Sequence, residues 1–135
     1  MSAVLDASAF LAYLNGEPGA DEVVRRLPAG ALISAVNLCE VYSKVAERGG
    51  DPQRLEEALR DRRILGGAVE VAPFTRADAV IAAELRPLTK SQGLSLGDRA
   101  CLALGKRLGL AVLTADAAWD KVPAEVAVAI VQIAR

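Results

Sequence analysis

Short apolar runs alternate along the chain with stretches in which apolar residues recur every three or four positions. Such runs are typical of buried strands, and the stretches between them are typical of amphipathic helices. The runs lie at residues 3–5, 31–33, 69–71, 111–114 and 126–133. The alternation predicts a single α/β domain over residues 1–135, with three layers and a central parallel sheet of about four to five strands that has helices on both faces.

Ordinary start and stop signals bound the predicted helices. Helices are expected at residues 7–15, 20–27, 34–48, 51–64 and 75–87, and a last one runs from the loop at 91–98 to residue 108. Thr75 and Asp78 form a capping-box pattern, so Asp78 is expected to be structural. Pro87 marks the end of the helix that Thr75 begins, because proline disfavours a helix interior.

Composition narrows the possible functions. Apolar residues make up 53% of the chain, and no apolar run is long enough to cross a bilayer. The N-terminus lacks the pattern of a secretion signal, so a cytoplasmic protein with no membrane partner is expected. Histidine is absent, which excludes Ser-His-Asp and Cys-His catalysis and most catalytic zinc sites. Cys39 and Cys101 lie in helical patterns and are expected to be buried free thiols.

The charge balance is close to neutral. With 16 basic and 17 acidic residues, the net charge is −1, which is not the globally basic profile of a strong nucleic-acid binder. A local basic rim is still compatible with it. The candidates for phosphate contacts are Arg25, Arg26, Arg62, Arg63, Arg99, Lys106 and Arg107.

Four carboxylates are the candidates for functional residues. Asp6 and Asp116 directly follow predicted strands, and Asp98 opens the helix before the second of these strands. Glu40 lies in the second turn of the helix that leaves the strand at 31–33. The carboxyl ends of parallel strands and the helix starts that follow them share one edge of a sheet, so the four are expected to converge there.

Taken alone, each carboxylate has an ordinary structural explanation. Asp6 and Asp98 fit helix caps, Asp116 fits a turn, and Glu40 falls on the polar face of its helix. Asp98 falls on the apolar side of its helix, where a carboxylate needs a partner. Together, clustered carboxylates repel one another unless a cation is present, and an all-oxygen ligand set favours Mg²⁺ or Mn²⁺.

The chain resembles the PIN-domain ribonucleases, and within them the VapC-type toxins of toxin–antitoxin pairs. The resemblance covers nearly the whole chain and rests on four segments in this order. They are Val4-Leu5-Asp6-Ala7-Ser8, Ser34 to Val41, Leu94 to Ala100, and Val112-Leu113-Thr114-Ala115-Asp116. Each segment alone is common, but their order and spacing together are specific.

The resemblance implies a site, an activity and partners. Asp6, Glu40, Asp98 and Asp116 would be catalytic metal ligands, Ser8 and Thr114 would be supporting hydroxyls, and Asp120 would be an additional carboxylate. The implied activity is Mg²⁺- or Mn²⁺-dependent endonucleolytic cleavage of RNA through metal-activated water. The implied partners are a second copy of the chain and a VapB-like antitoxin that blocks the site.

Two other functions remain open at this stage. The acidic rim could belong to a non-catalytic interaction module that binds a basic partner peptide. Asp6 could also be the nucleophile of a phosphoryl-transfer or phospho-receiver protein. Against the latter, Asp6 is followed by Ala7 and Ser8 instead of a second acid, and no strand ends on a lysine.

Overall fold

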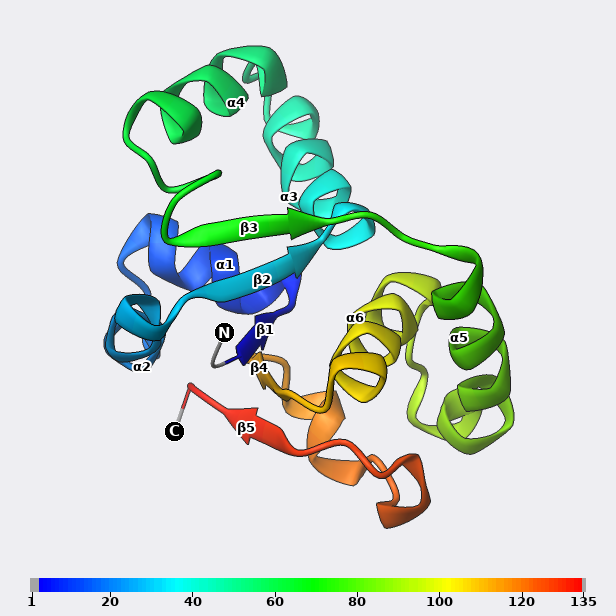
Figure 1. Cartoon of the computed structure of the whole chain (residues 1–135). Coiled ribbons are helices and arrows are strands. Elements are labelled where there is room, and N and C mark those ends of the chain that lie inside the picture. Colours follow the sequence, from blue (N-terminus) through cyan, green and yellow to red (C-terminus); the bar gives the residue numbers. More distant parts are fainter. Residues whose placement is uncertain (1–2, 135) are drawn as a thin grey trace.

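A five-stranded parallel sheet forms the centre of the fold. The computed structural model describes residues 3–134. The strands are β1 (Ala3–Leu5), β2 (Ala31–Ser34), β3 (Val69–Ala72), β4 (Ala111–Thr114) and β5 (Ile130–Gln132). Their order across the sheet is β3-β2-β1-β4-β5, and every neighbouring pair is parallel (Figure 1). The first strand is therefore central, which places its carboxyl end in the middle of the edge where ligands bind.

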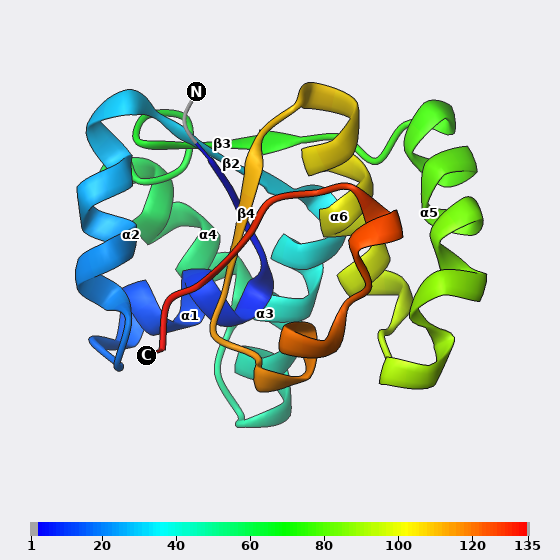
Figure 2. The same cartoon turned by 90° about the horizontal axis from the view of Figure 1, so that it is seen from below.

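Helices cover both faces of this sheet, as the strand and helix alternation predicts. They are α1 (Ala7–Asn15), α2 (Ala20–Arg26), α3 (Ala35–Glu47), α4 (Pro52–Asp61), α5 (Arg76–Thr89) and α6 (Leu96–Leu108). The first four lie on one side of the sheet, and α5 and α6 lie on the other (Figure 2). The predicted α/β fold, with its parallel sheet between two helical layers, is confirmed.

Side-chain alternation along the strands builds a separate core on each face. Ala3 and Leu5 pack with residues from α1 to α4, whereas Val4 packs with residues from α5 and α6. All three side chains have no exposed surface. Because successive strand residues point to opposite faces, a strand buried on both sides reads as a continuous apolar run, as the run at 3–5 does.

Asp78 has the structural role that its sequence pattern predicts. It forms a capping box with Thr75 at the start of α5. Its two carboxylate oxygens also accept hydrogen bonds from Arg107 of α6, at 2.6 and 3.4 Å. Burial alone would raise the pKa of Asp78, but the bonds from Arg107 and from the Thr75 N–H outweigh burial and hold it below its usual value. This pair ties the two helices together on one face of the sheet.

Several boundaries differ from the prediction. Helix α5 continues through Pro87 to Thr89. The lost hydrogen bond there would fall on the carbonyl of Ala83, which is in an exposed residue where water can reach it. The predicted last strand starts only at Ile130, because Ala127 adopts a left-handed conformation with φ of 58° after a short 3₁₀ helix.

Of the two cysteines, one departs from the expectation. Both thiols are free and Cys101 is buried, but Cys39 is exposed. Leu38 and Val41 turn inward from α3, so the intervening residue Cys39 points away from the core.

No helix among residues 3–134 combines the length and apolar composition that a membrane span needs.

Candidate active site at the carboxyl edge of the sheet

Asp6 is fixed at the middle of the carboxyl edge by the register of the two central strands. Leu5 of β1 pairs with Leu113 of β4, and the Asp6 N–H donates to the Leu113 carbonyl at 3.1 Å. Asp6 is also the N-cap of α1, where its carboxylate accepts the Ala9 N–H at 2.7 Å. Strand pairing and helix capping together hold one carboxylate at this point.

Two hydroxyls complete the surroundings of the Asp6 carboxylate. The Ser8 hydroxyl donates to Oδ1 at 2.7 Å, and the Thr114 hydroxyl donates to Oδ2 at 2.5 Å. These oxygens in turn accept backbone N–H groups, Ser8 Oγ from Ala115 and Thr114 Oγ1 from Asp116. The structure therefore places Ser8 and Thr114 against Asp6; their role in a metal site stays a prediction.

Asp6 is buried, with 3% of its surface exposed. Burial, and to a smaller extent the negative charge of Asp98, raise its pKa to about 6 against the lowering effect of its three hydrogen bonds. Because Asp6 is shielded from water and a second carboxylate is near, a bound cation would stabilise its negative charge.

Asp98 lies in the first turn of α6 and is half-buried. It forms a capping box with Ser95, in which the Ser95 N–H donates to Asp98 Oδ2 at 2.9 Å. Asp98 thus has the same cap position as Asp78 has in α5, but the structure pairs Asp78 with an arginine. For Asp98, the described residues supply no salt bridge.

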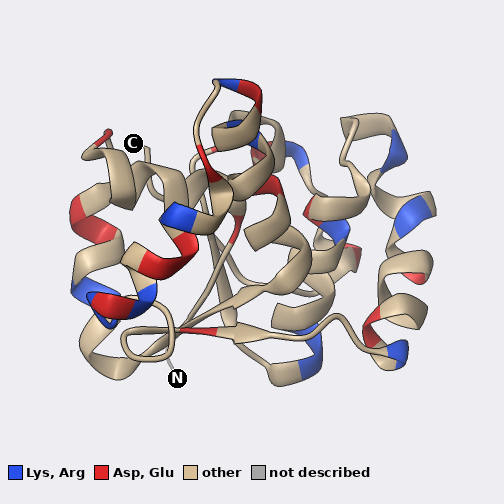
Figure 3. Ribbon diagram, turned by 90° about the horizontal axis from the view of Figure 1, so that it is seen from above, with Lys and Arg blue, Asp and Glu red and all other residues tan. Residues whose placement is uncertain are grey.

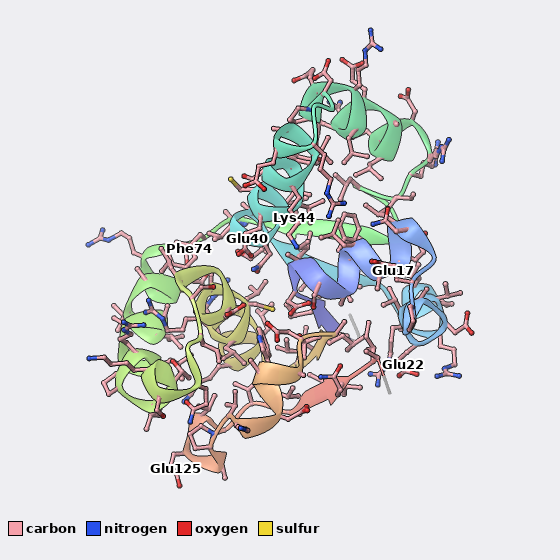
Figure 4. The ribbon with its side chains drawn as sticks, turned by 180° about the vertical axis from the view of Figure 1, so that it is seen from behind. Glu17, Glu22, Glu40, Lys44, Phe74 and Glu125 are labelled. Atoms are coloured by element: carbon pink, nitrogen blue, oxygen red, sulfur yellow. The ribbon has the colours of Figure 1, made fainter. Side chains whose placement is uncertain are left out.

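Glu40 is not the plain surface residue that its helical face suggests. It extends from α3 toward α6, as Figure 4 shows, and it is half-buried. Its Oε1 accepts a hydrogen bond from Asn37 Nδ2 at 2.8 Å. Its carboxylate lies directly over Gly97, next to Asp98, so close that a Cβ built on Gly97 would overlap Glu40 Oε2. Glu40 therefore lies against the start of α6.

Asp116 and Asp120 lie on the exposed side of the edge. Asp116 is the N-cap of the short 3₁₀ helix Ala117–Lys121, and its carboxylate accepts the Ala118 N–H at 2.9 Å. Gln132 of β5 donates to the Asp116 carbonyl and to Asp120 Oδ1 at 3.3 Å. Among the described residues, only the hydrogen bond from its backbone N–H to Thr114 links Asp116 directly to the Asp6 network.

The charges of the candidate site also affect the pKa of the Cys101 thiol. Its thiol is fully buried in α6, and burial raises its pKa well above the usual value. The charges of Asp6, Asp98 and Glu40 raise it further, in that order. Three of the four predicted carboxylates thus contribute to the raised pKa of one buried thiol.

The four predicted carboxylates do not form a closed cage, and their convergence on one ion stays a prediction. Within residues 3–134, no three acidic or cysteine side chains stand close enough together to hold an ion. Mg²⁺ normally keeps several waters and is bound through only one or two carboxylates. An open arrangement of oxygen ligands around a buried, hydroxyl-supported Asp6 therefore fits such an ion in its chemistry.

Asn37 and Gly97 are the residues that reasoning from the sequence missed. Asn37 falls on the polar face of α3 by its spacing, yet it is fully buried. Its Nδ2 bonds both Glu40 and the Gly97 carbonyl, the latter at 2.9 Å. Helical periodicity alone could not reveal this, because it is the packing of α6 on α3 that buries Asn37. A glycine directly before Asp98 was the one available signal.

Most of the candidate basic residues have structural partners. Arg25 and Arg26 pair with Glu22, and Arg107 pairs with Asp78. Arg99 and Lys106 donate to backbone carbonyls. Figure 3 shows lysine and arginine distributed over helices on both sides of the sheet. This distribution favours no one of them as a phosphate contact, so these residues stay candidates.

The chain was compared with known protein families and with curated proteins. The sequence pattern of the PIN domain family matches residues 3–125. Among curated proteins, none matches the chain.

Solved structures of similar fold include toxin–antitoxin proteins. A toxin–antitoxin complex from Klebsiella pneumoniae is 20% identical, with a TM-score of 0.69 and 97% of each chain covered. A DNA-bound VapBC from Salmonella typhimurium is 18% identical, with a TM-score of 0.71 and 98% of each chain covered. VapC20 from Mycobacterium tuberculosis, described as a Sarcin-Ricin loop cleaving toxin, is 20% identical, with a TM-score of 0.62 over 84% of this chain and 88% of its own.

Proposed function

The chain belongs to the PIN domain family, and from this premise we propose that it is a Mg²⁺- or Mn²⁺-dependent RNA endonuclease, the toxin of a toxin–antitoxin pair. The observation that carries the proposal is the buried Asp6, held by Ser8 and Thr114 at the sheet edge within reach of the Asp98 charge. The cleaving toxin of similar fold supports the reaction type.

Asp6 and Asp98, with Glu40 and Asp116, are the residues that would hold the ion. When bound, the ion would lower the pKa of a water and stabilise negative charge on the phosphodiester. Among the described residues, Asp6 Oδ1 accepts two hydrogen bonds and Oδ2 only one. Since a carboxylate oxygen can accept two, Oδ2 keeps capacity for a ligand bond while Ser8 and Thr114 fix the carboxylate plane.

The protein chain itself supplies position and charge at this site. The hydroxyls of Ser8 and Thr114 prevent Asp6 from rotating, and the N-terminus of α6 presents Asp98 on the same edge. Exposed Asp116 and Asp120 extend the acidic rim outward. With no histidine in the chain, proton transfer would fall to water and to these carboxylates.

The partners in this proposal are RNA, a VapB-like antitoxin and a second copy of the chain. The names of the structures of similar fold, which include VapBC complexes, support the antitoxin. A basic side chain of such a partner would be attracted to the acidic rim and would compete with the ion for it. The same electrostatics would suit the alternative, an interaction module with no catalysis.

Removal of divalent metal is expected to lower RNA cleavage by the purified chain by at least about 100-fold, since metal stabilisation of the transition state contributes several kcal/mol. The measurement is cleavage of total bacterial RNA in EDTA and after addition of excess Mg²⁺ or Mn²⁺. Recovery of cleavage with either ion would support the proposal. Cleavage that persists in EDTA, or tight binding of a basic peptide with no cleavage under any condition, would refute it.

A further inference from the structure

Asn37 occupies an unusual place for an amide. It is fully buried between α3 and α6, and its Nδ2 donates to Glu40 Oε1 at 2.8 Å and to the Gly97 carbonyl at 2.9 Å. Both partners are acceptors, so the orientation of the amide is fixed: the nitrogen, not the oxygen, faces them. One side chain therefore joins the Glu40 carboxylate to the first turn of the helix that bears Asp98.

The other end of this amide is unsatisfied. Asn37 Oδ1 is buried and has no hydrogen-bond partner among the described residues. A buried acceptor without a donor lowers stability, whereas an apolar side chain of similar shape would avoid that cost. The Gly97 carbonyl lies within α6, so it would keep its helical partner without Asn37. The stability gained from the two bonds that Asn37 donates is therefore offset in part by its unpaired oxygen, and such departures from local rules occur chiefly at functional positions.

Gly97 provides the space that this arrangement requires. A Cβ at position 97 would overlap the carboxyl carbon and both carboxylate oxygens of Glu40. Those atoms are the end of a flexible side chain, so an added methyl group would displace the carboxylate while leaving the backbone in place. Gly97 is the second residue of α6, where alanine is a better helix former.

We propose that Asn37 and Gly97 are positioning residues that hold the Glu40 carboxylate against the start of α6 as a preorganised metal ligand. This inference rests on the proposed metal-dependent function and deepens it. Asn37 supplies a donor that fixes one oxygen, Oε1, and Gly97 supplies the space. Oε2 is the Glu40 oxygen left to bind an ion. Neither residue touches the ion in this account; each acts through Glu40.

Two substitutions distinguish an effect on metal affinity from an effect on the stability of the fold. Asn37→Leu removes the donor and the unsatisfied oxygen together, and Gly97→Ala displaces the carboxylate. Each variant is expected to lower Mn²⁺ affinity by about 10-fold, the usual effect of removing a group that orients a metal ligand. Each is expected to unfold at about the same temperature as the unmodified chain, because water can reach the half-buried Glu40 carboxylate when its contact is lost. A purely structural role predicts lower thermal stability and an unchanged affinity for the ion.

The experiment is a Mn²⁺ titration of the EDTA-treated, dialysed full chain, followed by EPR of the free ion, with thermal unfolding measured on the same samples. Ser43→Ala is the matched control, because Ser43 is exposed on the same helix and its hydroxyl bonds Cys39, away from the carboxylates. Weaker Mn²⁺ binding in both variants, with unmodified binding in the control and no loss of thermal stability, supports the proposal.

Two outcomes overturn it, and they differ. If both variants bind Mn²⁺ as tightly as the unmodified chain, the positioning role is wrong while the metal-dependent function stands. If the unmodified chain itself binds no Mn²⁺, the proposed function fails, and the positioning role fails with it.

Discussion

Replacing Asp6 with asparagine is expected to lower RNA cleavage by at least about 100-fold while leaving the fold intact, because it removes a ligand charge whose effect is worth several kcal/mol. The new amide can be accommodated. Its oxygen can accept from Ser8 and the Ala9 N–H, and its nitrogen can donate to Thr114 Oγ1, whose own proton can turn to Ser8 Oγ at 3.3 Å.

The same substitution is expected to raise stability in EDTA. Burial places the pKa of Asp6 at about 6 in the folded chain, above its value of 3.8 without burial. Such a group contributes stability that is fully present below pH 3.8 and is lost as pH rises through about 6. At pH 8, the Asp6→Asn substitution would therefore add about 1–3 kcal/mol to the free energy of unfolding, from roughly two pKa units at 1.36 kcal/mol each.

Urea unfolding of both chains at pH 8 and pH 5 measures this effect. The stability gain of Asp6→Asn is expected to be largest at pH 8 and to shrink at pH 5, where the folded unmodified chain already binds the proton. Groups other than Asp6 titrate alike in both chains and cancel in the difference. A variant that loses stability at pH 8, or keeps full cleavage activity, would contradict this account of Asp6.

Asp98→Asn is expected to lower RNA cleavage as strongly as Asp6→Asn does. Unlike Asp6→Asn, it is expected to lower the stability of the fold. Asp98 caps α6 through Ser95 and interacts favourably with the helix N-terminus. Its neutralisation is therefore expected to cost about 0.5–1 kcal/mol. The chain offers a matched control in Asp78, which has the same capping-box position in α5.

Asp78→Asn is expected to leave cleavage unchanged while costing more stability than Asp98→Asn. Asp78 is buried and its partner Arg107 would lose its counter-charge, a loss of about 1–3 kcal/mol because the arginine is still partly hydrated. Cleavage rates and urea midpoints of the two variants test this together. Equal loss of cleavage in both would mean that activity follows helix capping, not the carboxylate at the sheet edge.

The fold could be predicted because its signals are local. A strand buried on both faces reads as an apolar run, and Ser34 and Thr75 cap helices where the pattern places them. The predicted boundaries were wrong where solvent exposure or the backbone conformation of a single residue outweighed the local sequence pattern. Pro87 is tolerated because the residue of the orphaned carbonyl is exposed. The last strand is short because of the left-handed Ala127.

The candidate site was predictable only in part. Asp6 and Asp98 follow from strand ends and helix starts, which chain order alone locates. The surroundings of Glu40 do not follow from order, because its contacts with Asn37 and Gly97 arise from the packing of α3 on α6 across 60 residues of chain. Periodicity places Asn37 and Glu40 on a polar face, and only the neighbouring helix makes that face part of the site.

If the proposed function is right, the carboxylates at the sheet edge bind the ion that supports RNA cleavage. The most direct measurement is anomalous diffraction from crystals of the full chain soaked with Mn²⁺. We expect a Mn²⁺ peak in contact with the carboxylates of Asp6 and Asp98, and we expect this peak to disappear in Asp6→Asn crystals. A Mn²⁺ peak at another place only, or no peak in a chain that cuts RNA, would contradict it.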